Sequence, residues 1–71
     1  MSTLNPKKLL NSKWTAVKPE RKEKHFIIIE TEYDEDGAMV RCLMQAVMTK
    51  REFEIEWHDL KNIEQWRAGW L

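Results

Sequence analysis

The sequence predicts an α+β fold that is mainly β, a three-stranded antiparallel meander followed by a short C-terminal helix. Two strand-forming runs flank the turn signal Asp34 to Gly37, where Asp tolerates left-handed backbone geometry and Gly adopts it freely. A third run, 52–57, alternates strictly between Glu and apolar residues, which is the period of a half-exposed strand. Seventy-one residues suffice for one small core. We therefore expect a single domain, 1–71.

The first twenty residues predict a short helical turn and an irregular arm. Asn5 is a good N-cap, and Pro6 suits the first helical position because its missing N–H would be unpaired there. Trp14 and Val17 follow without clear periodicity, and Lys18-Pro19 bends the chain. We expect the apolar residues of this arm to dock on the sheet.

The sheet itself is predicted at 22–33, 38–48 and 52–57, within 22–57. Residues 25–29 form a β-branched and aromatic run that is typical of a strand with a buried centre. The second strand is apolar at every even position and also at Met39, Leu43 and Val47, so both of its faces need cover. Three arrangements would supply it: the N-terminal arm with Trp14 wraps the second face, the sheet curls into an SH3-like half barrel, or a second subunit packs there as a homodimer.

The last segment, 58–71, predicts a helix with a C-terminal Trp cap. Asp59 is a suitable N-cap, and Leu60, Ile63 and Trp66 recur every third residue, which indicates a helix near 60–67. Gly69 would supply the left-handed residue after the helix and return Trp70 to its last turn.

Large aromatic side chains are an efficient means of filling a small core, and the chain has four tryptophans. Trp14 in the arm and Trp70 near the end are the two that we expect to be partly exposed. Trp and Arg are common anchors of protein interfaces, so Trp14, Trp70 and Arg67 are candidate partner-binding residues. The leading hypothesis is a non-enzymatic protein–protein interaction or assembly module.

The net charge is zero but unevenly distributed. Residues 1–25 carry seven basic side chains against Glu20 and Glu23, and the rest of the chain is acidic. The alternative hypothesis is therefore single-stranded nucleic-acid binding, in which basic residues follow the phosphates and Trp14 stacks on a base. Balanced overall charge argues against a dedicated nucleic-acid binder, and the two halves could instead neutralise each other. The candidate contacts are Lys7, Lys8, Lys13, Lys18, Arg21, Lys22 and Lys24.

No catalytic, cofactor-binding or metal-binding motif is present, so we expect no enzyme activity and no cofactor. His25, His58 and Cys42 have none of the usual metal-ligand spacings. Cys42 lies mid-strand among apolar residues, where thiolate formation is disfavoured. A lone cysteine and the lack of a secretory or membrane-spanning run indicate a cytoplasmic protein without membrane partners.

The stretches Asn5 to Leu10, Ser12 to Ala16, Thr49 to Arg51 and Trp66 to Leu71, with Trp57 and Leu60 between them, resemble a family of short bacterial Trp-rich conserved hypothetical proteins. The resemblance covers nearly the whole chain and depends on the spacing of the tryptophans. It implies a free-standing bacterial domain of unknown function. No activity, cofactor or site residue is implied by it.

Overall fold

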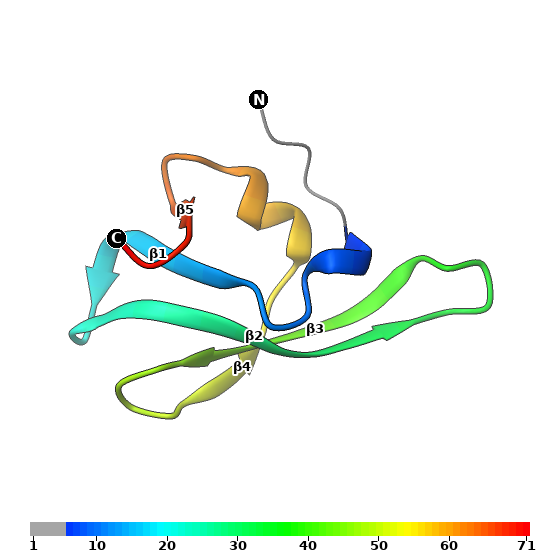
Figure 1. The fold of residues 1–71 in the computed structure, drawn as a ribbon, viewed down its shortest axis with the longest axis horizontal. Coiled ribbons are helices and arrows are strands. Elements are labelled where there is room, and N and C mark those ends of the chain that lie inside the picture. Colours follow the sequence, from blue (N-terminus) through cyan, green and yellow to red (C-terminus); the bar gives the residue numbers. More distant parts are fainter. Residues whose placement is uncertain (1–5) are drawn as a thin grey trace.

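The computed structural model describes residues 6–71, which form one five-stranded antiparallel sheet (Figure 1). The strand order is β4-β3-β2-β1-β5, and β4 and β5 are the free edges of a sheet that does not close into a barrel. The described residues contain no α-helix, only two 3-10 turns. The elements are η1 (Pro6–Lys8), β1 (Lys13–Glu20), β2 (Glu23–Tyr33), β3 (Met39–Ala46), β4 (Glu52–Glu54), η2 (Trp57–Lys61) and β5 (Trp66–Ala68).

The predicted meander is confirmed, with β4 shorter than expected. The Asp34 to Gly37 turn joins β2 to β3: Asp34 Oδ1 accepts from the N–H groups of Asp36 and Ala38, both at 2.9 Å, and Gly37 has φ 84°. Ile55 still donates its N–H to Cys42 O, but the chain then leaves the sheet, and Trp57 begins η2.

The prediction of an irregular arm is wrong, because residues 13–20 form β1. A 3-10 turn does begin at Pro6, while the expected cap, Asn5, lies outside the described residues. β1 pairs with β2 on one side and β5 on the other, for example Thr15 opposite His25 and Arg67. Both partners come later in the chain, so tertiary pairing decides a conformation that local propensity leaves open.

The predicted C-terminal helix is also wrong, since residues 57–61 form a 3-10 turn and 66–68 form β5. Of the three recurring apolar residues, only Leu60 lies in the 3-10 turn; Ile63 follows this turn and Trp66 begins β5. Of that series, Leu60 is buried whereas Ile63 is 69% exposed. The cap is Glu56, whose side chain accepts from the N–H of His58, and not Asp59. Gly69 has the expected positive φ of 84°.

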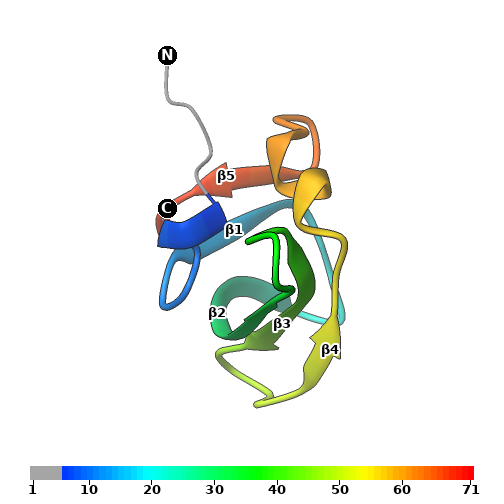
Figure 2. The ribbon, with the colours of Figure 1, turned by 90° about the vertical axis from the view of Figure 1, so that its right-hand side faces the viewer.

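The core fills the concave side of a bent sheet. Figure 2 shows β1 and β5 above β2, β3 and β4, with η2 beside them. Trp14 and Phe26 are cross-strand neighbours on this side, and it is covered by Leu9, which follows η1, and by Leu60 of η2. The other buried apolar residues are Ile28, Cys42, Met44 and Ala46.

The second face of the sheet remains largely open. Leu43 and Gln45 point to it, because the alternate residues Cys42, Met44 and Ala46 are buried. Met39 packs against the core instead, since the pairing register shifts between Arg41 and Met39. The expected arrangement in which the N-terminal arm with Trp14 wraps this face is wrong, because Trp14 lies in the core on the other side of the sheet.

A C-terminal strap, residues 69–71, crosses part of the second face over β1 and β2. The buried Thr15 hydroxyl donates to Gly69 O at 2.6 Å and accepts from Leu71 N at 3.0 Å. The indole Nε1 of Trp70 donates to Phe26 O at 2.9 Å, and His25 Nε2 lies 3.0 Å from Leu71 O. The strap therefore satisfies polar groups of two strands at once.

Candidate functional site

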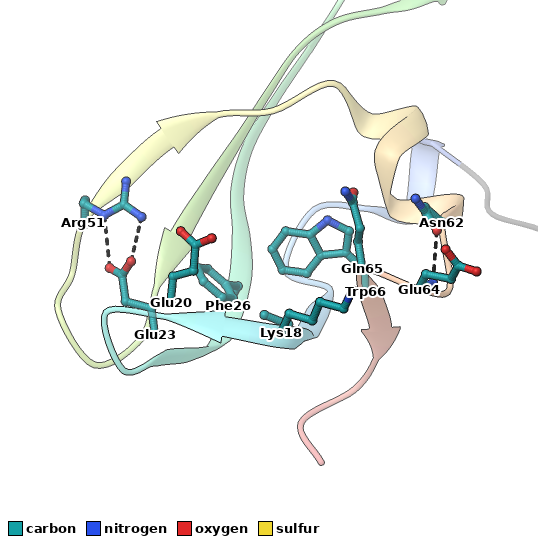
Figure 3. Close-up of a pocket in the computed structure, with 10 residues that line it drawn as sticks. Lys18, Glu20, Glu23, Phe26, Arg51, Asn62, Glu64, Gln65 and Trp66 are labelled. Carbon is teal, nitrogen blue, oxygen red and sulfur yellow. Dashed lines mark hydrogen bonds and ion pairs between the residues drawn. The ribbon is translucent and has the colours of Figure 1, made fainter.

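A hollow of about 470 Å³ opens on the concave side of the sheet, between the β1–β2 turn and the segment that joins η2 to β5 (Figure 3). It exists because the core stops short of this end: β1 carries Ala16, then Lys18 and Glu20, where apolar residues would have continued it. The lining residues are Ala16, Lys18, Glu20, Glu23, Phe26, Arg51, Asn62, Glu64, Gln65 and Trp66.

Two aromatic rings form the apolar part of the hollow. Phe26 of β2 and Trp66 of β5 meet edge to face, with ring centroids 5.1 Å apart at 85°. Phe26 is 5% exposed, whereas Trp66 is only half-buried. Edge-to-face contact fixes both rings, so a ligand would meet a preformed aromatic surface.

One wall is a buried carboxylate held by two residues of the β3–β4 connection. Glu23 is 4% exposed. Its oxygens accept from Arg51 Nη2 at 2.6 Å, Arg51 Nε at 3.1 Å and Thr49 Oγ1 at 2.6 Å. These bonds lower the pKa of Glu23 from 4.5 to about 2, and the bonds from Arg51 have the largest effect. Arg51 also lies over the Phe53 ring, 4.6 Å from its centroid, so its guanidinium is fixed in place.

The opposite wall carries amides and a carboxylate. Figure 3 shows Asn62, Glu64 and Gln65 across the hollow from the Glu23–Arg51 pair, with the aromatic rings between them. Asn62 Oδ1 accepts from the backbone N–H of Glu64 at 3.0 Å, which shapes this turn. Amide groups at a rim can pair with either donors or acceptors of a ligand.

The β1–β2 turn beside the hollow has an unusual backbone. Arg21 and Lys22 have φ of 55° and 63°, the arrangement of a two-residue hairpin turn that normally uses Asn and Gly. In the neighbouring β3–β4 connection Lys50 has φ 64°. Figure 1 shows both turns at the same end of the molecule, opposite the β2–β3 turn.

The structure separates the three predicted partner anchors. The expectation that Trp14 is partly exposed is wrong: it is 6% exposed, and its Nε1 donates to Ser12 Oγ at 2.8 Å, because β1 places it in the core. Trp70 is 42% exposed, as expected, and lies in the C-terminal strap with Lys13 Nζ 4.8 Å from its ring. Arg67 is exposed on β5, where its Nε donates to Ile63 O.

The seven predicted basic contacts divide into two groups. Lys7 and Lys8 belong to η1, and Lys13 begins β1. Lys18 lines the hollow, while the others lie at the β1–β2 turn end: Arg21, Lys22 and Lys24. The seven predicted basic residues therefore do not form one continuous arm in the structure. With Trp14 in the core, the stacking residue of the nucleic-acid hypothesis is also buried.

Sequence reasoning missed the residues that the hollow brings together. Trp66 and Gln65 fall within the helix predicted near 60–67, and Arg51 is named only among the stretches that carry the family resemblance. Glu23 entered the sequence analysis only in the charge balance of residues 1–25, with no predicted contact. The pairing of β1 with β5 brings Trp66 opposite Ala16, and the ion pair between Glu23 and Arg51 joins the β1–β2 turn to the β3–β4 connection.

Other chemically capable groups are committed to structure. Arg41 bonds to Glu30, Glu32 and Glu54 on the second face of the sheet. Burial raises the pKa of the Cys42 thiol to about 11, which disfavours the reactive thiolate. His58 Nδ1 contacts Glu56 Oε1. Within residues 6–71, no group of three or more His, Cys, Asp or Glu side chains could hold a metal ion.

The fold and the site together define a small all-β domain with a preformed hollow that two aromatic rings line. Among the described elements, none is a helix of the length and apolarity that a membrane crossing requires. The family model of the Tryptophan-rich protein family, DUF2389, matches residues 12–71. The chain belongs to this family, which confirms the resemblance noted from its tryptophan spacing. No curated protein and no solved structure matches the chain.

Proposed function

We propose that this domain is a non-enzymatic protein-interaction module, an SH3-like half barrel that binds a segment of a partner protein in the hollow. The bent open sheet, with a 3-10 turn between β4 and β5, supports the half-barrel comparison. This likeness is one of architecture alone and implies no function; the support for the proposed function comes from the hollow.

The observation that carries the proposal is the composition of the hollow. Binding sites are concave, with an apolar surface and a few convergent polar groups that fix orientation. Here Phe26 and Trp66 supply the apolar surface, Asn62 and Gln65 supply amides, and Arg51 is already locked by Glu23. A preformed site saves the ligand the cost of ordering it. The mixture of charges suits a peptide better than a uniformly charged polymer.

Single-stranded nucleic acid is the second candidate. Two observations favour it: basic residues lie on the two turns at one end of the molecule, namely Arg21, Lys22 and Lys50, and the hollow contains the half-buried indole of Trp66. Phosphate contacts and aromatic stacking are the two elements of such binding. Against it, Glu20 and Glu64 line the same hollow and would repel phosphates.

Selection from a random 12-residue phage-displayed peptide library tests the proposal. Selected peptides would be labelled and titrated by fluorescence anisotropy against the protein, Q65R and Q45R. Gln65 lines the hollow, whereas Gln45 lies on the second face, so the same substitution is made at two sites. We expect Q65R to weaken binding at least about tenfold and Q45R to have little effect, as for a side chain at the centre of an interface.

Two results would contradict the proposal: a library that yields no specific peptide, or peptides that Q65R and Q45R affect equally. A fifteen-nucleotide oligothymidylate in the same assay tests the second candidate. Tight binding that weakens steeply between low and moderate salt would favour nucleic acid instead.

A further inference from the structure

β4 presents a regular row of backbone groups at one free edge of the sheet. Its inner side pairs with β3, and the hydrogen bonds of an antiparallel pair fall on every second residue. The N–H of Ile55 donates to Cys42 O of β3 at 2.9 Å, so the bonded set includes Phe53 and not its two neighbours. The N–H and C=O groups of Glu52 and Glu54 therefore point away from the sheet, with the spacing that an added strand requires.

The side chains of β4 divide between the two faces of the sheet. Glu52 lies opposite Gln45, which points to the second face, and Glu54 lies two residues further along the same face. Phe53 points the other way and packs against the core. A strand added outside β4 would therefore have two glutamates beside it on one face and an aromatic ring on the other.

The second face beside β4 has an excess of negative charge. Arg41 is the cation at its centre, and its guanidinium bonds to three carboxylates, those of Glu30, Glu32 and Glu54. Glu52 adds a fourth carboxylate, which takes part in none of the ion pairs of residues 6–71 and is exposed. Positive charge brought to this edge by a partner would therefore be attracted.

We propose that the free edge of β4 binds an extended segment of a partner protein, an added antiparallel strand in which basic and apolar residues alternate. Basic residues would lie opposite Glu52 and Glu54 and exchange backbone hydrogen bonds with them, and the apolar residue between would lie beside Phe53. In such strand addition, backbone bonds give affinity and alternate side chains give specificity. Antiparallel pairing continues the arrangement of the sheet.

This contact goes beyond the proposed function, because it is separate from the hollow. Residues 52–54 are not among those that line the hollow. The other free edge, β5, offers fewer groups, since the N–H of Trp66 already donates to Asn62 O at 2.9 Å.

The same glutamates disfavour a second copy of the chain at this edge. An antiparallel pairing of two β4 strands centred on Phe53 would place Glu52 opposite Glu54, and like charges directly opposite each other are destabilising. Charged side chains on short edge strands commonly protect proteins against aggregation. Such protection acts against a strand of like charge and does not oppose a basic one.

Labelled peptides of about seven residues test the inference by fluorescence anisotropy at moderate salt. The first alternates Lys and Val, beginning and ending with Lys; the second has the same residues in two blocks; the third alternates Glu and Val. We expect the first to bind at least about tenfold more tightly than the other two, because it alone places a basic side chain next to each glutamate and an apolar one beside Phe53.

Methylation of the peptide backbone tests the strand pairing. N-methyl groups on the two inner Lys residues remove N–H donors that would face β4, so they should weaken binding at least about tenfold. N-methyl groups on two Val residues are the matched control, because those N–H groups would point away from β4. We expect the control peptide to bind nearly as well as the unmethylated one.

Protein variants and heteronuclear NMR locate the contact. E52K should weaken binding of the Lys–Val peptide at least about fivefold, whereas E35K, the same charge change in the exposed β2–β3 turn, should have little effect. Circular dichroism of each variant confirms the fold. Saturation with peptide should slow hydrogen exchange at the backbone N–H of Glu52 and Glu54 and leave that of Ala68 on β5 unchanged.

Several results would overturn the inference: no binding of the alternating peptide, equal binding of the alternating and block peptides, equal weakening by E52K and E35K, or slowed exchange at Ala68 in place of Glu52. Greater weakening by methylated Val than by methylated Lys would show a parallel strand and would also overturn it. The hollow is tested separately by Q65R, so either contact can fail while the other stands.

Discussion

Replacement of the β1–β2 turn by R21N/K22G should stabilise the protein. Arg21 and Lys22 both have positive φ, at about 1–2 kcal/mol for each left-handed residue. Gly removes the penalty and Asn reduces it, while the extra freedom of Gly in the unfolded chain costs about 0.5–1 kcal/mol. We expect a net gain of about 1.5 kcal/mol. For a domain of this size, that raises Tm by roughly 6–12 °C.

The assay is thermal and urea unfolding followed by circular dichroism, with an unchanged urea slope as the sign that only stability has changed. R21A/K22A is the control, because it removes the same charges but keeps both β-carbons. Equal stabilisation by the two double variants would trace the gain to charge repulsion and refute the argument from strain.

W14A should lose about 3–5 kcal/mol in urea unfolding, because the indole is 6% exposed in the core, and W70A should lose less, since Trp70 is 42% exposed; equal losses would contradict this placement. The stability that Glu23 contributes should be present above pH 4.5 and be lost as the pH falls toward about 2, because its folded pKa is depressed. E23Q should therefore have a flatter acid limb than the native protein in urea unfolding at different pH values, and parallel curves would refute the assignment. Cys42 should react with a thiol reagent at pH 8 only as fast as the protein opens, because its folded pKa is about 11; rapid reaction without urea would show that it is accessible.

Local signals in the sequence were sufficient for the central hairpin. Asp34 caps the turn with its own carboxylate and Gly37 supplies the positive φ, so both devices lie within the turn itself. The alternation of apolar residues likewise placed Cys42, Met44 and Ala46 in the core. Such features depend on neighbours a few residues away.

The outer strands could not be predicted in the same way. β1 becomes a strand because it lies between β2 and β5, and β5 forms because β1 offers it an edge. A spacing of three between Leu60, Ile63 and Trp66 does not distinguish an α-helix from a 3-10 turn followed by a strand.

The hollow was not predictable because its residues meet only in the folded sheet. Glu23 and Arg51 are 28 positions apart, and Trp66 reaches the hollow through its pairing with Ala16. The uneven charge was visible in the sequence. The division of the basic residues into two groups was not visible there, since it follows from the way the strands pair.

The position of β1 between β2 and β5 also bears on how the protein is made. Synthesis proceeds from the N-terminus, so β1 emerges early but acquires its second neighbour only when residues 66–68 have been added. Until then one edge of β1 has unpaired N–H and C=O groups, and Thr15 lacks its bonds to the strap. An unpaired strand edge is a template for aggregation. Nascent chains stalled before residue 66 should therefore depend on chaperones more than finished ones.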